Sequence, residues 1–200
     1  LDGLMFPSTG TFEAFGVPIT EKALDDEQLN RAFRSRVGFV FQNSDAQAFS
    51  ASVFEEVAFG CLQLGLDADA TRARVRETLA MLAIEHLVDR PPHRLSGGEK
   101  KKVAIASVLV MGPEVLLFDE PTAGLDPRTQ FWLLDLLGQL SDAGKTIVLA
   151  THDLGSLTVV ADRAVVLGED HRIWLDSTPD AVLADRDLLV RANLVHPRAR

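Results

Sequence analysis

Short runs of consecutive apolar residues are the clearest feature in the pattern of hydrophobic and polar positions. A run of four to eight apolar residues, bounded by polar or turn-forming residues, is typical of a strand buried in a sheet. Four stretches come close to this description, at residues 37–41, 115–118, 146–150 and 163–167, of which the last two begin with a polar residue. Residues 11–18 also have a strand-like pattern, which Gly16 interrupts.

Segments with the spacing of amphipathic helices separate most of these runs. They are residues 25–36, 98–111, 127–143 and 154–161. Helices that alternate with short apolar strands predict an α/β fold, in which a parallel sheet is covered on both faces. Two further helical segments, 53–64 and 70–88, have no strand between them and predict an all-helical insertion. Pro91 and Pro92 mark a break after this insertion.

The composition limits the classes of function that the chain can serve. Its 200 residues fit one domain with an inserted subdomain. The formal net charge of −9 argues against nucleic-acid binding as the main role. The longest apolar stretches are shorter than the ~20 residues that span a bilayer, so a membrane role requires a partner. The single Cys61 excludes an internal disulfide and a cysteine-based zinc site.

The sequence Leu-Ser-Gly-Gly-Glu at residues 95–99 predicts a helix whose N-terminus can bind an anion. Ser96 and Glu99 have the spacing of a capping box, in which each side chain bonds the backbone N–H of the other. Gly97 and Gly98 allow a ligand to approach the backbone closely. The partial positive charge of a helix N-terminus favours phosphate. Taken alone, these residues fit an ordinary capped helix equally well.

Polar residues follow three of the apolar runs, at the points where the expected strands end. Asp119 and Glu120 follow one run, Gln42 ends a second, and His152 lies two residues beyond a third. Because parallel strands deliver their carboxyl ends to one edge of the sheet, where ligands bind, we expect these side chains to be neighbours. Asp119 is placed to hold Mg²⁺, Gln42 to bind Mg²⁺ or water, and Glu120 to polarise an attacking water. The alternatives are two solvated acids at a strand end and a structural histidine.

A Gly-Lys-Thr sequence at residues 144–146 does not belong to a phosphate-binding loop. Such a loop has the pattern G-x-x-x-x-G-K-[S/T] and runs from a strand into a helix. The upstream Gly138 is one residue too far away for this pattern. The order is also reversed, because Gly144 is a helix-ending signal and a strand follows it. No other segment of the sequence has the pattern.

Together these motifs resemble those of the nucleotide-binding subunits of ABC transporters, in the order of that family and over nearly the whole chain. The matching elements are the signature motif at 95–99, Walker B with its catalytic glutamate at 116–120, the D-loop at 123–126, the Q-loop glutamine Gln42 and the switch histidine His152. The resemblance implies two catalytic residues, Glu120 and His152. It implies ATP-binding roles for Gln42, Ser96, Gly97, Gly98, Glu99 and Asp126, and Mg²⁺-binding roles for Asp119 and Gln42.

Several stretches are similar to the energy-coupling-factor branch of this family, which includes importers of cobalt, nickel and vitamins. Two of them are Phe-Gln-Asn-Ser-Asp-Ala-Gln at 41–47 and Val-Ala-Phe-Gly at 57–60. Residues 96–106 fit the same branch, and the tail at 192–197 favours its cobalt and nickel group. Lys102 is a departure, because the family commonly has arginine at this position.

The resemblance implies a P-loop NTPase-type parallel-sheet core with an inserted helical subdomain. We expect the core at residues 1–44 and 95–200, and the helical subdomain at 45–94. Residues 1–10 have the pattern of a helix end and a turn, and they resemble the segment just after the family's first core helix. The Walker A loop and its strand are therefore expected to precede Leu1, and the chain to be an N-terminally truncated copy. A sheet without that strand has an unpaired edge and uncovered apolar surface.

In the family that the chain resembles, two subunits enclose ATP, and each adds its signature motif to the partner's phosphate-binding residues. The resemblance implies a second ATPase subunit, in a homodimer or a heterodimer, and transmembrane importer subunits as partners. It places this chain at the cytoplasmic face of the plasma membrane, as a peripheral subunit held by those partners. The parent protein is expected to couple ATP hydrolysis to uptake of cobalt, nickel or a vitamin, and this chain alone to be inactive. The alternative is a non-catalytic subunit that lends its signature motif to an intact paralogue. A soluble ABC ATPase of DNA repair or translation fits less well, because those proteins usually carry long coiled-coil or tandem-domain insertions.

Overall fold

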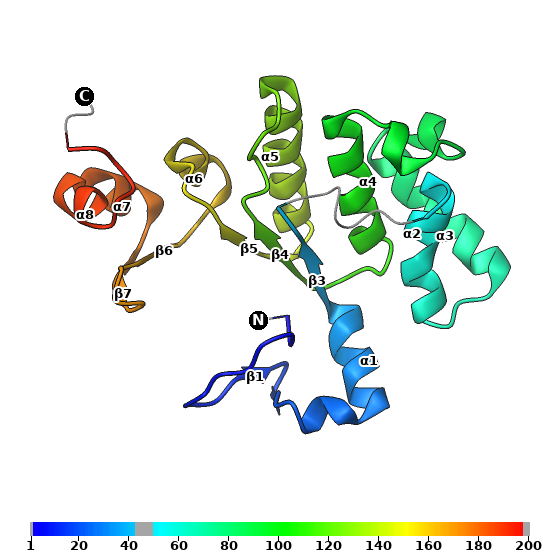
Figure 1. Ribbon diagram of the computed structural model, residues 1–200, viewed down its shortest axis with the longest axis horizontal. Helices are drawn as coiled ribbons and strands as arrows, with labels where there is room; N and C mark the ends of the chain where they lie inside the picture. The colour runs from blue at the N-terminus through cyan, green and yellow to red at the C-terminus, as the bar shows by residue number, and fades with distance from the viewer. Residues whose placement is uncertain (1, 43–49, 198–200) are drawn as a thin grey trace. The chain divides into compact units, whose positions relative to one another are not determined.

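The computed structural model of the protein describes residues 2–42 and 50–197. The chain divides into two compact units, and each is described by itself (Figure 1). Unit 1 contains Leu1–Leu125 and Gly144–Ala150, and unit 2 contains Asp126–Ala143 and Thr151–Arg200. The division at 1–44, 45–94 and 95–200 stays a prediction, and its first boundary lies outside the described residues.

A parallel sheet of three strands forms the centre of unit 1. Its strands are β3 (Val37–Val40), β4 (Val115–Asp119) and β5 (Thr146–Ala150), in the order β3-β4-β5. In the register of the sheet, Val40 lies opposite Phe118 and Asp119 lies opposite Ala150. This arrangement confirms the expected parallel pairing and brings the carboxyl ends of the three strands to one edge.

The strands of this sheet differ in burial. Leu116, Leu117 and Phe118 of the central β4 are buried, as the apolar run predicts. The prediction that β5 is also buried is wrong, because its residues alternate between exposed and half-buried, and Val148 is 40% exposed. Within the part of the chain that the structure describes, β5 pairs only with β4 and is an edge strand of the sheet.

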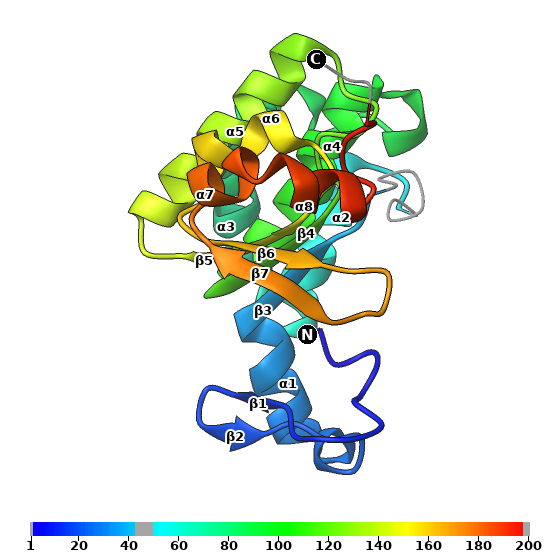
Figure 2. The ribbon, with the colours of Figure 1, turned by 90° about the vertical axis from the view of Figure 1, so that its left-hand side faces the viewer.

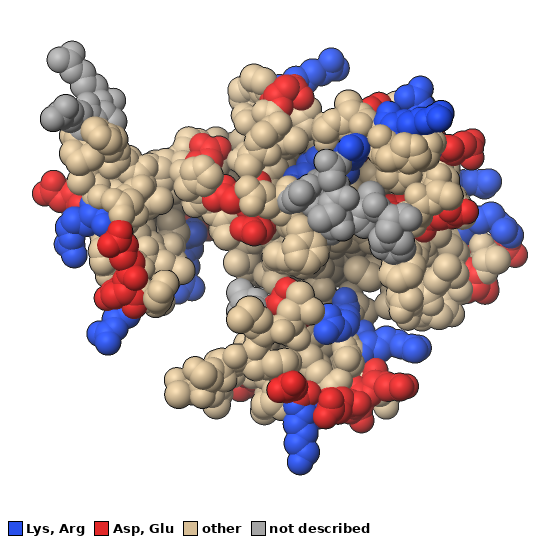
Figure 3. All heavy atoms as spheres, viewed as in Figure 1, with Lys and Arg blue, Asp and Glu red and all other residues tan. Residues whose placement is uncertain are grey.

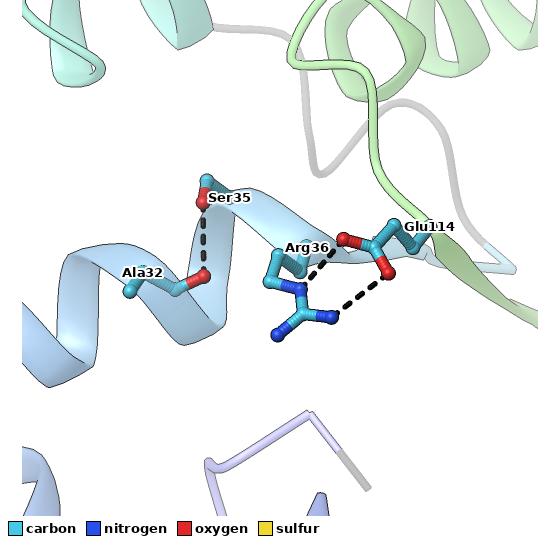
Figure 4. A network of polar contacts seen from close by, with 4 residues as sticks. All are labelled: Ala32, Ser35, Arg36 and Glu114. Atoms are coloured by element: carbon cyan, nitrogen blue, oxygen red, sulfur yellow. Dashed lines mark hydrogen bonds and ion pairs between the residues drawn. The ribbon is translucent and has the colours of Figure 1, made fainter. Parts of the chain in front are cut away.

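Helix α1 (Glu27–Arg36) leads directly into β3, and an ion pair fixes this junction to the start of β4. Asp26 caps the helix by accepting a hydrogen bond from the backbone N–H of Leu29 at 2.8 Å. Arg36 forms a two-point pair with Glu114, with Nε–Oε1 and Nη2–Oε2 distances of 2.6 and 2.9 Å (Figure 4). The pair therefore ties the amino ends of two neighbouring strands together.

Three helices form the helical part of unit 1, and Figure 1 shows them side by side. They are α2 (Val53–Gln63), α3 (Ala68–Met81) and α4 (Gly97–Leu109), and α2 contacts both others. The expectation of one continuous helix over 70–88 is wrong, because α3 ends at Met81 and Ala83 has φ +55°. Two short 3₁₀ helices, Glu85–Leu87 and Pro92–Arg94, then lead to α4.

The N-terminal part of unit 1 is a small hairpin with its own apolar cluster. The strands β1 (Glu13–Ala14) and β2 (Val17–Pro18) pair antiparallel across Phe15 and Gly16, whose φ angles of +55° and +75° suit a tight turn. The cluster beneath it contains Ile19, Leu24 and Phe33, and the 3₁₀ helix Ala23–Asp25 supplies one of them. The expected helix end in residues 1–10 is wrong for the described residues 2–10, which contain no helix.

Unit 2 contains helices and a second, separate sheet. Its elements are α5 (Pro127–Asp142), α6 (Leu154–Val160), β6 (Ala164–Leu167), β7 (Ile173–Ser177), α7 (Pro179–Ala184) and α8 (Arg186–Arg191). The expected strand at 163–167 is present as β6, but it pairs antiparallel with β7 (Figure 2). Side chains from β6, α7 and α8 form the core of this hairpin layer, namely Ala164, Val166, Val182, Leu188 and Leu189.

No helix in the described ranges is long and apolar enough to cross a membrane. Figure 3 shows acidic and basic side chains close together over the α1 region of unit 1.

Candidate functional site

The N-terminus of α4 has the capping box that its sequence predicts. Glu99 N donates to Ser96 Oγ at 3.4 Å, and Ser96 N donates to Glu99 Oε2 at 2.8 Å. The Ser96 hydroxyl also donates to Glu99 Oε2 at 2.7 Å. These bonds, that from the Ser96 backbone first, lower the pKa of Glu99 below its usual value. A rigid, ionised cap therefore sets the direction of the first helical turn.

Gly97 begins this helix at a position where the chain itself has no need of glycine. A Cβ placed on Gly97 meets no heavy atom within 4 Å, and φ lies outside the left-handed region. The first-turn N–H groups of a helix have no partner inside the helix and are available to a ligand. The missing side chain therefore leaves room for something that approaches from outside, as expected for an anion site.

Asp119, Glu120 and Gln42 lie at the same edge of the parallel sheet. Asp119 is the last residue of β4, Glu120 follows it, and Gln42 lies two residues beyond the end of β3. Both acids are half-buried, and Gln42 is exposed. The register places Val40 opposite Phe118, so the chain beyond β3 leaves the sheet next to the two acids. The three residues therefore share one edge of the sheet, whereas their expected side-chain neighbourhood stays a prediction. Residues 43–47 of the matched stretch lie outside the described residues.

The backbone of Glu120 has an unusual conformation. Its φ is +41°, in the left-handed region that residues with a Cβ seldom adopt. Two backbone hydrogen bonds hold it there, from Glu120 N to Ala150 O at 2.9 Å and from Ala123 N to Glu120 O at 3.1 Å. Strained residues held in this way are concentrated at functional sites. The turn redirects the chain sharply after β4 and leaves the Glu120 side chain at the sheet edge.

His152 and Asp126 belong to unit 2. His152 is exposed and follows β5 by two residues. Asp126 caps α5: its Oδ1 accepts from Arg128 N and Thr129 N, and its Oδ2 accepts from the Thr129 hydroxyl at 2.6 Å. These bonds, that from the Thr129 hydroxyl first, lower the pKa of Asp126. The structure thus gives Asp126 a capping role, and the ATP-binding role stays a prediction.

The sequence reasoning missed Lys101, which is only 2% exposed. It lies one helical turn after Gly97 and one turn before the buried Ile105, on the apolar face of α4. The sequence did contain a signal for its burial, because the residues three and four positions away from this lysine on the helix are apolar or glycine. Burial lowers the pKa of Lys101, and the nearby negative charge of Asp119 acts in the opposite direction.

The donor set suits Mg²⁺ only together with other ligands. The Asp119 carboxylate and the Gln42 amide offer the oxygen atoms that Mg²⁺ prefers. The described residues contain no group of three or more His, Cys, Asp or Glu side chains that could hold a metal ion. Mg²⁺ commonly takes one or two carboxylates and completes its shell with water and phosphate oxygens. The residues present therefore fit Mg²⁺ as part of a nucleotide complex.

Comparison with known proteins places these features in one family. The model of the ABC transporter family matches residues 1–123. A putative ABC transporter ATP-binding protein of Methanosarcina acetivorans is 54% identical over 98% of this chain and 72% of its own length. The nickel import ATP-binding protein NikO of Rhodobacter capsulatus is 49% identical over 98% of this chain and 78% of its own length.

A solved structure agrees with the sequence relatives. The structure of cbiO1 from Clostridium perfringens, described as part of the ABC transporter complex cbiONQ, superimposes with a TM-score of 0.79 at 40% identity. The superposition covers 98% of this chain and 77% of the other. The match thus includes the parallel sheet, the helical part and the helix capped by Ser96 and Glu99. The chain therefore belongs to the ABC transporter family, as an ATP-binding subunit with the P-loop NTPase fold.

Proposed function

We propose that this chain serves an importer that uses ATP hydrolysis to take up a metal ion, nickel or cobalt, with a vitamin as the other candidate cargo. The nickel import role named for NikO and the transporter complex named for cbiO1 support this proposal. Transmembrane subunits made by other chains provide the path across the membrane. The subunit works at the cytoplasmic face of that membrane and contacts them through its helical part.

The observation that carries the proposal is that unit 1 contains two separate half-sites, each of which a second subunit would complete. One half is the capped N-terminus of α4, where Ser96 is exposed and a Cβ on Gly97 would meet no atom within 4 Å. The other is the sheet edge with Asp119 and Glu120. The helix end binds phosphate oxygens through backbone N–H groups. Glu120 orients and polarises the attacking water, which a carboxylate at this position can do as a base. The role of His152 at the γ-phosphate stays a prediction, because this residue belongs to unit 2.

Metal binding in this site falls to Asp119 and Gln42. When bound, Mg²⁺ neutralises charge on the phosphate oxygens of the nucleotide. Asp119 holds the ion directly or through water, and the Gln42 amide bonds the ion or the attacking water. Both residues supply neutral or anionic oxygen, which is the ligand type that Mg²⁺ selects.

The 200 residues contain no G-x-x-x-x-G-K-[S/T] sequence. That loop provides the backbone N–H groups and the lysine that hold the β- and γ-phosphates. A polypeptide of these 200 residues is therefore expected to hydrolyse ATP negligibly by itself. A homodimer of the same polypeptide has no complete site, whereas a heterodimer with an intact subunit has one.

A second role follows from the open first turn of α4. In this role the chain is a non-catalytic subunit, which lends Ser96, Gly97 and Gly98 to the ATP held by an intact paralogue. The capping box favours it, because the geometry of this helix end is fixed within the chain and requires no nucleotide. In this role Glu120 is dispensable and Gly97 is not.

The test measures ATP hydrolysis by the purified chain alone and mixed with a family member that has a complete phosphate-binding loop. We expect negligible turnover alone and a gain in the mixture, which Gly97→Arg abolishes by filling the open space. Glu169→Gln, on the surface of unit 2, is the control that leaves the gain unchanged. Robust turnover by the chain alone, abolished by Glu120→Gln, would refute the expected inactivity. A mixture with no gain would refute the lending of the signature helix.

A further inference from the structure

A buried cation lies just behind the phosphate-facing end of α4. Lys101 is four residues after Gly97, so it lies about 6 Å further along the helix axis. Only 2% of its surface is exposed, although lysine is almost never fully buried unless its charge is compensated. A buried ammonium without hydrogen-bond partners is strongly unfavourable, so the contacts of this group determine what it does.

The Lys101 ammonium bonds the chain at the end of β3. It donates to the Phe41 carbonyl oxygen at 3.1 Å and to the Gln42 carbonyl oxygen at 3.3 Å. These acceptors are 60 and 59 residues away in the sequence. A single side chain therefore joins the signature helix to the backbone of the expected Q-loop glutamine. Hydrogen bonds from a charged donor are about twice as strong as those between neutral groups.

The same ammonium group of Lys101 also lies near Asp119, the acid at the end of β4. Val40 lies opposite Phe118, so Phe41 is at the level of Asp119 on the neighbouring strand. The negative charge of Asp119 is felt at Lys101, where it favours the charged form of the amine. The ammonium thus connects three parts of the candidate site: the helix that receives phosphate, the glutamine and the acid.

We propose that Lys101 is a positioning residue, which transmits displacement of the phosphate-binding end of α4 to the backbone of Gln42. The inference rests on the proposed function, because α4 is displaced only if its N-terminus receives a nucleotide. The physical basis is the stiffness of the connection. One helical turn, the Lys101 side chain and one charge-assisted hydrogen bond separate Gly97 from the Gln42 carbonyl, and a second bond holds the adjacent Phe41 carbonyl. A Lys101 that served stability alone would leave Gln42 insensitive to nucleotide.

The test follows backbone hydrogen exchange in residues 37–42 when nucleotide binds. The chain is mixed with a family member that has a complete phosphate-binding loop, and the probe is the magnesium complex of a non-hydrolysable ATP analogue. In the unaltered pair, we expect the analogue to slow exchange in this segment by about tenfold, the scale of a hydrogen bond to a charged group. Lys101→Met should abolish this slowing while the pair still binds the analogue. Lys22→Met removes an exposed lysine and should leave the slowing unchanged.

Three outcomes overturn the proposal. If Lys101→Met responds to the analogue as strongly as the unaltered chain, Lys101 does not couple the segments, and the proposed function stands. If the unaltered pair binds the analogue without any change in residues 37–42, the coupling does not exist. If the pair neither forms nor binds the analogue, the proposed function fails, and the coupling fails with it.

A milder variant keeps the test decisive if Lys101→Met does not fold. Lys101→Gln retains a donor but removes the charge, so it should fold and give a weaker response. A response equal to that of the unaltered chain would overturn the proposal.

Discussion

Replacement of Gly38 by alanine should destabilise unit 1 through a clash between β3 and the elements beside it. Gly38 lies in β3. A Cβ at this position would lie 2.4 Å from Val108 Cγ1, 3.1 Å from Pro113 Cγ and 3.3 Å from Leu116 Cδ2. Ordinary carbon contacts begin at about 3.5 Å. The side chain of Val108 therefore has to move, and it is buried in α4.

The magnitude follows from two opposing terms. Inserting a methyl group into a well-packed interior costs about 1–3 kcal/mol. Alanine also restricts the conformations of the unfolded chain, which raises the free energy of unfolding by about 0.4–1 kcal/mol where the native backbone conformation suits alanine. The net loss in the free energy of unfolding is therefore about 1–2 kcal/mol. With a urea m-value of about 2 kcal/mol/M, the midpoint should fall by roughly 0.5–1 M.

The choice of probe decides whether this loss is seen. Both tryptophans, Trp132 and Trp174, lie in unit 2, and the chain has no tyrosine. Tryptophan fluorescence therefore reports on unit 2, whereas the substitution lies in unit 1. Far-UV circular dichroism includes the helices of unit 1, and hydrogen exchange in residues 37–40 reports on β3 itself. We expect Gly38→Ala to lower the urea midpoint seen by circular dichroism and to speed hydrogen exchange in residues 37–40. The midpoint seen by fluorescence should change less.

Gly97→Ala provides the matched control for stability. A Cβ at Gly97 meets nothing within 4 Å, and the residue is helical. Alanine should therefore leave the free energy of unfolding unchanged or raise it by at most about 1 kcal/mol, which is at most about 0.5 M in the urea midpoint. Equal midpoints for Gly38→Ala and Gly97→Ala would refute the reasoning from the close approach of β3 to α4.

Three other substitutions test separate features of the structure. Folding lowers the pKa of Glu99, so its carboxylate stabilises the protein above the unfolded pKa, and this contribution is lost as the pH falls through the folded pKa. When urea midpoints are measured from pH 6 downwards, the midpoint should therefore fall more steeply for the unaltered chain than for Glu99→Gln. Arg36→Ala should leave the urea midpoint nearly unchanged, since Arg36 and Glu114 are 40% and 56% exposed, and a large fall in the midpoint would contradict a surface pair. Gly168→Ala would place a Cβ 1.9 Å from Trp174 Cε2, so the emission of that tryptophan should shift, and an unchanged spectrum would count against this packing.

The regular elements near the sheet could be predicted from the sequence because local pattern decides them. The apolar run before Asp119 predicts a buried strand, and β4 is the central strand of the sheet. The end of α5 could be predicted equally well, because Gly144 takes a φ of +84° that favours glycine. The capping box at Ser96 and Glu99 is likewise a local feature of four residues.

The remaining features depend on contacts that the sequence pattern does not specify. The run at 146–150 is almost as apolar as β4, and its exposure reflects its place at the edge of the sheet that the described residues form. The turn at Ala83 breaks a helical pattern without glycine or proline. The helices α7 and α8 have six residues each, too few to show a helical period. The sequence places Lys101 on the apolar face of α4, but its bonds to the end of β3 depend on tertiary packing.

The left-handed backbone of Glu120 bears on the history of this chain. A glycine at this position would adopt φ +41° without steric strain, whereas for glutamate this backbone conformation is less favourable by roughly 1 kcal/mol. Selection for stability alone would thus replace the glutamate, and selection for water activation would keep it. In a non-catalytic subunit, which contributes only its signature helix to a partner's site, we expect glycine or asparagine to replace the glutamate at position 120. A glutamate kept at this strained position is therefore what the proposed role in water activation leads us to expect.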